Sequence, residues 1–162
     1  MEISKELASI INDQINYELY SGYIYLSMAA WFERNNLNGM THWMKMQAKE
    51  EFGHAMRFWK HIVDRGGKIV LESIEKPKTE WESPLKAWEV AFQHEMNVTK
   101  RIFKIGEIAD KEGDKTVTPL LKWFYNEQAE EEEQTRKVLE MLKKIGNLTN
   151  ALSKLDTKLG NR

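Results

Sequence analysis

The chain carries one arrangement of polar residues twice, and this repeat restricts its fold more than any other feature. Glu51 and His54 lie three positions apart, so on a helix both side chains project from the same side and can hold a single ion. Together with Glu18 they form a set that recurs 77 residues later as Glu95, Gln128 and Glu131. The repeat predicts two helical hairpins related by an approximate twofold axis, with their polar groups converging between them.

Length, composition and charge indicate a single all-α domain. The 162 residues suit one domain, and only three prolines occur, which leaves long uninterrupted periodic segments. Acidic and basic residues nearly balance, 25 against 24, so we expect no dedicated nucleic-acid partner. Cysteine is absent, which excludes thiolate metal sites and disulfides. Because we find neither an apolar signal core nor the roughly 20 apolar residues of a membrane span, we expect a cytoplasmic protein without a membrane partner.

Four long helices are predicted, at about residues 4 to 33, 40 to 64, 84 to 111 and 116 to 144. Ser4 and Ser83 are the expected N-caps, and Gly113 and Gly146 the expected stops. Residues 68 to 82 contain Pro77 and lack helical periodicity, so we expect a long connection. About 15 extended residues reach roughly 50 Å, beyond the roughly 38 Å of a 25-residue helix. The second and third helices can therefore be parallel, and residues 1 to 162 form one domain whose four-helix bundle, about 4 to 145, has one long crossover.

The repeated polar residues fall on the apolar stripes of these helices. At 100° per residue, positions 7 or 11 apart nearly coincide, which places Glu18 in one row with Leu7 and Tyr25. The same counting assigns core-facing rows to Glu51, His54, Glu95, Gln128 and Glu131. We find no Lys or Arg on the middle turns of these stripes. Burying one unmatched ion costs several kcal/mol, so metal cations are the favoured counterions, with shared protons and internal water as the alternative.

The predicted ligands are oxygen-rich and suit hard or borderline cations. Iron, manganese, zinc and magnesium all stay possible, and Glu51 could bridge two ions. Residues 130 to 133 form an acidic run in which Glu131 faces the core. Glu50, Glu127 and Glu130 lie on the flanks of their helices and predict an auxiliary cation site if those flanks face each other. Ordinary surface charge is the alternative for these three.

The last segment of the chain has an apolar stripe of its own. Four leucines follow helical spacing, at Leu148, Leu152, Leu155 and Leu159. They predict a short fifth helix at about residues 148 to 159, outside the bundle, whose stripe needs a partner. A frayed tail is the alternative.

Several segments together resemble the bacterial non-haem type of the ferritin family. They are NDQINYELYSGYIYL at 12–26, QAKEEFGHAMR at 47–57, QHE at 93–95 and WFYNEQAEEE at 123–132. The resemblance implies that one iron is held by Glu18, Glu51 and His54. It implies that a second is held by Glu51, Glu95 and Glu131, with Gln128 close by, and that a third is served by Glu50, Glu127 and Glu130.

The resemblance also implies a function. A ferritin of this type is a ferroxidase that oxidises Fe(II) with oxygen or peroxide and stores ferric mineral in a shell of twenty-four subunits. Tyr25 matches the family's central tyrosine, which tunes the centre or donates an electron; a core tyrosine with one hydrogen-bond partner is an equal alternative.

Two departures from related designs bear on cofactors and iron access. Bacterioferritin uses a second Glu-x-x-His and a haem-ligating methionine, whereas the matching positions here are Gln128-x-x-Glu131 and Phe52, so we expect no haem. The segment KTVTPLL at 115–121 lacks the acidic pair that lines the iron channels of animal ferritins. Nearby acidic residues that could replace it are Asp110, Glu112 and Asp114.

Other functions stay open at this point. One is a di-iron or di-manganese peroxidase or oxygenase of the ferritin-like superfamily, although rubrerythrins usually append a Cys-rich iron domain and this chain has no Cys. Another is a helical scaffold or a DNA-protecting mini-ferritin. Mini-ferritins place their irons between subunits, whereas the ligands predicted here lie within one bundle.

Overall fold

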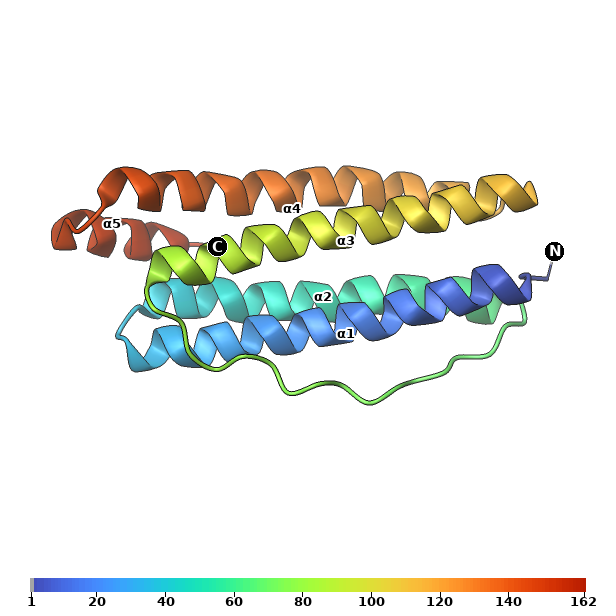
Figure 1. The fold of residues 1–162 in the computed structure, drawn as a ribbon, viewed down its shortest axis with the longest axis horizontal. Coiled ribbons are helices and arrows are strands. Elements are labelled where there is room, and N and C mark those ends of the chain that lie inside the picture. The colour runs from blue at the N-terminus through green and yellow to red at the C-terminus, as the bar shows by residue number, and fades with distance from the viewer. Residues whose placement is uncertain (1) are drawn as a thin grey trace.

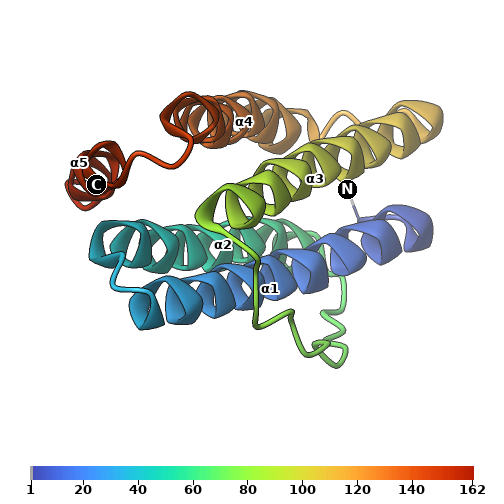
Figure 2. The same ribbon diagram turned by 60° about the vertical axis from the view of Figure 1, so that its left-hand side comes forward.

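A computed structural model describes residues 2–162 as an all-α protein with five helices (Figure 1). They are α1 (Lys5–Arg34), α2 (Asn38–Asp64), α3 (Pro84–Glu112), α4 (Thr118–Ile145) and α5 (Thr149–Leu159). The described part of the chain contains no strand, and none of its helices is long and apolar enough to cross a bilayer. Helices α1 to α4 form the bundle and α5 lies at one end (Figures 1 and 2). The predicted fold class is confirmed; Met1 of the predicted domain lies outside the described residues.

Helix boundaries follow the capping residues read from the sequence. The Ser4 hydroxyl accepts a hydrogen bond from the Leu7 amide at 3.0 Å and starts α1, and Ser83 does the same for α3 through the Lys86 amide at 3.1 Å. Gly113 has φ 68°, the left-handed conformation that ends α3 without a Cβ clash.

The start of α2 depends on a residue that is distant in sequence. This helix begins at Asn38, two residues earlier than predicted, and Leu37 before it provides no side-chain cap. The Asp156 carboxylate of α5 accepts from the amides of Gly39 at 3.1 Å and Met40 at 2.7 Å. These amides are among those that a helix leaves unpaired at its N-terminus, so α5 caps α2 through space.

The crossover between α2 and α3 runs along α1 with no regular secondary structure (Figure 1). Two asparagines of α1 hold its main chain. Asn12 donates to the Lys68 carbonyl at 2.9 Å and accepts from the Val70 amide at 2.8 Å. Asn16 repeats the pattern with the Val70 carbonyl and the Glu72 amide. The crossover spans the bundle, so α2 and α3 are parallel, as predicted.

The core consists of two apolar clusters separated along the bundle axis. One contains Phe32, Met44 and Trp88 and includes Leu155 of α5. The other contains Phe58 and Phe124, whose rings stack at 4.1 Å between centroids. In each of the four long helices a stretch between the two clusters carries buried polar residues instead. The bundle therefore has a polar layer at mid-length.

Gly39 provides a test of how α5 is attached. A Cβ at this position would lie 1.6 Å from the main-chain oxygen of Asp156, which cannot move without moving α5. We expect Gly39→Ala to detach α5 and to increase hydrogen exchange of residues 149–159. Gly53→Ala is the matched control, because it lies in the same helix and its Cβ would meet nothing within 4 Å. That control should gain about 0.5–1 kcal/mol of stability. Unchanged exchange in Gly39→Ala would contradict this attachment.

Candidate metal centre

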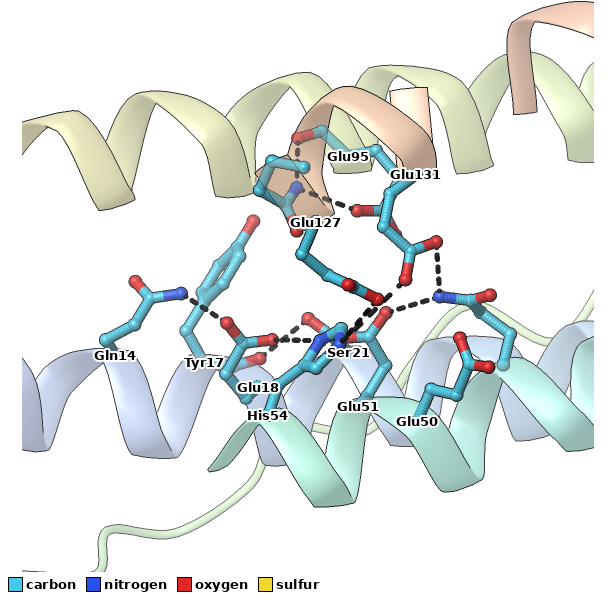
Figure 3. A network of polar contacts seen from close by, with 12 residues as sticks. Gln14, Tyr17, Glu18, Ser21, Glu50, Glu51, His54, Glu95, Glu127 and Glu131 are labelled. Carbon is cyan, nitrogen blue, oxygen red and sulfur yellow. Dashed lines mark hydrogen bonds and ion pairs between the residues drawn. The ribbon is translucent and has the colours of Figure 1, made fainter. Parts of the chain in front are cut away.

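The polar layer at mid-bundle brings together the two sets of repeated residues (Figure 3). Glu18 comes from α1, Glu51 and His54 from α2, Glu95 from α3, and Gln128 and Glu131 from α4. Each of these six residues is at most 4% exposed. Both hairpins therefore contribute to one buried cluster, and the role of its members as ligands stays a prediction.

His54 lies between two groups of carboxylates. Its Nδ1 is 3.2 Å from Glu51 Oε2 and 3.8 Å from Glu18 Oε2. Its Nε2 is 3.6 Å from Glu127 Oε1 and 4.0 Å from Glu131 Oε1. Ligand atoms of Glu18, Glu51 and His54 lie within 4.8 Å of one another, as do those of His54, Glu127 and Glu131. Each group has the spacing that one cation could bridge.

Glu95 belongs to neither of these two groups of possible ligands, and both of its carboxylate oxygens accept hydrogen bonds. Its Oε1 accepts from the Tyr25 hydroxyl, and its Oε2 accepts from Gln128 Nε2 at 3.1 Å. Gln128 also donates to the Glu95 main-chain oxygen at 3.2 Å. Tyr25 and Gln128 thus fix the Glu95 carboxylate from two sides, and Tyr25 is fully buried beside it.

Two glutamines that we did not predict as site residues orient the carboxylates. Gln47 Nε2 donates to Glu51 Oε1 and to Glu131 Oε2, both at 2.9 Å, and so joins the two hairpins. Gln14 Nε2 donates to Glu18 Oε1 at 2.8 Å. Both glutamines precede their glutamate by four positions, which places each pair on one helix face. That spacing is the signal in the sequence that could have identified them.

A positive charge reaches the cluster indirectly. Arg101 Nε donates to Gln14 Oε1 at 2.9 Å, and Gln14 in turn holds Glu18. The middle turns of the apolar stripes carry no Lys or Arg, as the sequence indicated. Arg101 belongs to α3 and reaches the cluster only through Gln14, at its edge. The amide of Gln14 separates this guanidinium from the carboxylate, so it does not form an ion pair with Glu18.

Several buried acceptors in the layer have no hydrogen-bond partner among the described residues. They are Glu18 Oε2, Gln47 Oε1, Gln128 Oε1 and Glu131 Oε1. A buried oxygen without a donor costs about 1–3 kcal/mol, and more when it is charged. Carboxylate and amide oxygens are also the ligands that hard cations prefer. The donor set and its unpaired atoms therefore fit a metal.

Burial and mutual repulsion raise the pKa values of the acids. Burial is the largest cause for Glu51, whose pKa rises to about 7. Burial and the charge of Glu51 raise the pKa of Glu95 well above its usual range, and burial and the charge of Glu95 do the same for Glu131. Burial lowers the pKa of His54, but the carboxylates of Glu18 and Glu51 outweigh it and raise that pKa to about 12. Without metal, the cluster holds protons and the imidazolium is its internal cation.

The three residues of the predicted auxiliary site lie in different surroundings. Glu50 and Glu127 line one open pocket of about 440 Å³, together with His54, Arg57 and Trp123. The Glu127 carboxylate approaches His54, whereas Glu50 Oε2 accepts from Arg162 at 2.7 Å. Glu130 is exposed and belongs to neither of the two groups. The auxiliary site stays a prediction, with Glu127 nearest to the buried cluster.

The acidic residues near the start of α4 are partly engaged elsewhere. Asp114 is 6% exposed and forms an ion pair with Arg65. Glu112 accepts from the Ser4 hydroxyl at 2.6 Å. Asp114 therefore ties Arg65, the residue that follows α2, to the turn before α4, and it does not present a free carboxylate for a channel.

Comparison with known sequences identifies relatives along nearly the whole chain. Residues 8–145 match the family model described as Ferritin-like domain. The chain is 38% identical over 160 residues to a bacterial non-heme ferritin of Bacteroides fragilis, with 99% of each chain covered. It is 34% identical over 160 residues to a bacterial non-heme ferritin of Staphylococcus saprophyticus, covering 99% of this chain and 96% of the relative.

Solved structures agree with the sequence relatives. An open pore ferritin from the hyperthermophilic archaeon Archaeoglobus fulgidus has a TM-score of 0.98 and 42% identity, with 99% of each chain covered. A humanized archaeal ferritin has a TM-score of 0.98 and 44% identity, covering 99% of this chain and 98% of that one. With the family model matching most of its length, the chain belongs to the ferritin family.

Proposed function

We propose that this protein is an iron-storage ferritin whose buried polar layer is a ferroxidase centre. The observation that carries the proposal is the set of buried carboxylates with unpaired oxygens, contributed by both hairpins of a ferritin-family bundle. The named relatives do not favour a peroxidase, an oxygenase or a DNA-protecting mini-ferritin. The cytoplasmic location stays a prediction.

Iron is the substrate in this proposal, held at two positions. Glu18, Glu51 and His54 would hold one Fe(II), and Glu51, Glu95 and Glu131 the second, with Gln128 adjacent. Glu51 is shared because its two oxygens face different neighbours, His54 on one side and Gln47 with Glu131 beyond it on the other. Glu95 must exchange its hydrogen bond with Gln128 or Tyr25 for a metal bond.

The reaction needs an electron acceptor, which oxygen or peroxide supplies. Each of two Fe(II) ions loses one electron, and oxygen gains two electrons and two protons to become hydrogen peroxide. Carboxylates stabilise the Fe(III) product because they are hard anionic ligands. The protons held without metal by the acidic side chains and by the His54 imidazolium leave when the cations bind, because a ligating imidazole must be neutral. Iron binding therefore releases protons at the site.

Tyr25 supports this chemistry from beside the cluster. Its hydroxyl donates to Glu95, and burial, followed by the charge of Glu95, raises its pKa well above the usual range. Tyr25 therefore stays protonated and positions Glu95, and donation of an electron is the additional role that the family resemblance implies. Glu50, Glu127 and Glu130 would serve a third iron, and the first two of them line the pocket beside His54.

Storage requires an assembly, and we propose a shell of twenty-four subunits. The chain exposes apolar side chains on α1 and on the crossover, among them Tyr23 at 50%, Leu26 at 51% and Leu71 at 57%. Contact with neighbouring subunits would remove this apolar surface from water.

Aerobic addition of Fe(II) tests the proposed activity. We expect stoichiometric oxygen consumption and a ferric core that stays with a large assembly. His54→Ala removes the imidazole of the cluster and should slow initial oxidation by at least about 10- to 100-fold, the loss found when residues that only orient metal ligands are replaced. Glu132→Gln, on the same helix as Glu131 but outside both groups, is the control and should oxidise iron normally. Oxygen consumption without retained iron would contradict storage.

Glu95→Gln separates metal binding from stability. Burial raises the pKa of Glu95 and so disfavours its charged form, and the unpaired Gln128 Oε1 can accept from a new amide. A neutral isostere should therefore change the metal-free melting temperature by no more than about 2–4 °C. The stabilisation by Zn(II), about 2.7 kcal/mol at a hundredfold excess over Kd for one site, should shrink. Thermal unfolding with and without Zn(II) measures both, with Glu132→Gln as control. A loss of 3–5 kcal/mol in the metal-free variant would instead indicate a broken buried ion pair.

Zn(II) affinity should fall as the pH falls from 8 to 6. The pKa of Glu51 is about 7 without metal, so below that pH a cation must displace its proton, and above it the carboxylate is already free. The affinity should change about tenfold per pH unit for each proton released. Calorimetry in buffers of different ionisation enthalpy measures affinity and proton release together. An affinity independent of pH over this range would contradict the raised pKa.

A further inference from the structure

Arg162, the last residue described, folds back onto α2 and makes several contacts there. Its guanidinium donates to Glu50 Oε2 at 2.7 Å and to the Trp43 main-chain oxygen at 3.4 Å. It also lies over the Trp43 ring, 4.3 Å from the centroid. The main-chain oxygen of Arg162 is 3.0 Å from His42 Nε2. With 19% of its side chain exposed, Arg162 is held on α2 rather than free in solvent.

The position of Arg162 is set by contacts that do not involve Glu50. Asp156 caps the start of α2, and Leu155 is buried in the core cluster at that end. A Cβ on Gly160 would lie 3.2 Å from the Gly39 Cα, so the two backbones touch. These contacts bring the end of α5 to α2 whether or not Glu50 carries a charge.

A cation in the predicted auxiliary site would be a second partner for the Glu50 carboxylate. It lines the same pocket as His54 and Glu127 and is adjacent in sequence to Glu51. In Figure 3 its side chain projects beside Glu51 but stands apart from the dashed contacts of the cluster. An arginine is always charged and offers only donors, so it competes with a metal for the carboxylate oxygens.

We propose that Arg162 is a displaceable counter-cation of Glu50: it occupies the carboxylate in the absence of metal and leaves when a cation binds at the auxiliary site. The inference rests on the proposed role of Glu50 at that site. Cation binding at the auxiliary site would then break the contact of Arg162 with Glu50 and loosen the segment that follows α5.

The ion pair between Arg162 and Glu50 is weak enough for a cation to displace the guanidinium. Glu50 is 47% exposed at its side chain, and exposed ion pairs contribute little because water and salt screen them. Removal of the guanidinium should therefore tighten cation binding at the auxiliary site by roughly two- to fivefold, which corresponds to the upper part of the range for such pairs. Binding at the two central positions should not change.

Anaerobic Zn(II) titration of the assembled protein, followed by calorimetry, tests the proposal. The variants are Arg162→Gln, Glu50→Gln and both together. Lys158→Gln is the matched control, since it removes the same charge from the same end of the chain at an exposed position. We expect tighter binding of a third ion in Arg162→Gln, little change in Lys158→Gln, and loss of the third ion whenever Glu50 is replaced.

Hydrogen exchange of residues 149–162 provides a second measurement. Zn(II) should increase exchange at the end of α5 in the wild type and not in Glu50→Gln. If Glu50→Gln loses the third ion but Arg162→Gln binds it unchanged or more weakly, the auxiliary site stands and the role of Arg162 is wrong. If neither the wild type nor Arg162→Gln binds a third ion, both the auxiliary site and the role of Arg162 are wrong.

Discussion

Mutual repulsion among buried carboxylates is the constraint on which the rest of this structure depends. Glu18, Glu51, Glu95 and Glu131 converge at mid-bundle, where each is at most 2% exposed. Water cannot screen them there, and a buried ion without a partner costs several kcal/mol. The apolar clusters on either side supply the burial that holds the layer closed. The fold therefore buries carboxylates whose mutual repulsion a bound cation would reduce.

The protein manages this repulsion through protons and amides rather than through buried ion pairs with Lys or Arg. His54 is protonated between its carboxylates, and Glu95 and Glu131 have raised pKa values. Gln14 and Gln47 donate to the carboxylates and are neutral. A permanent guanidinium in the layer would be difficult to displace. Protons, in contrast, leave readily when a metal takes their place.

Much of the bundle and of its buried cluster could be predicted because both depend on local periodicity. The row that contains Leu7, Glu18 and Tyr25 follows from 100° per residue, and Ser4 and Ser83 follow from capping chemistry. The cap that Asp156 provides to α2 could not be predicted, since 116 residues separate it from Met40 and no local pattern links them. The approach of Arg162 to Glu50 was missed for the same reason.

The crossover shows how one element can determine the path of another. Within the crossover, the Asn12 and Asn16 side chains bond main-chain atoms of Lys68, Val70 and Glu72 and no side chain. Side chains of the crossover take no part in these bonds, so residues of α1 determine the path of this part of the crossover. A homologue could therefore change the side chains at 68, 70, 71 and 72 and keep the same course, provided that it retained the two amides one helical turn apart, an apolar residue at 69 and no proline at 70 or 72.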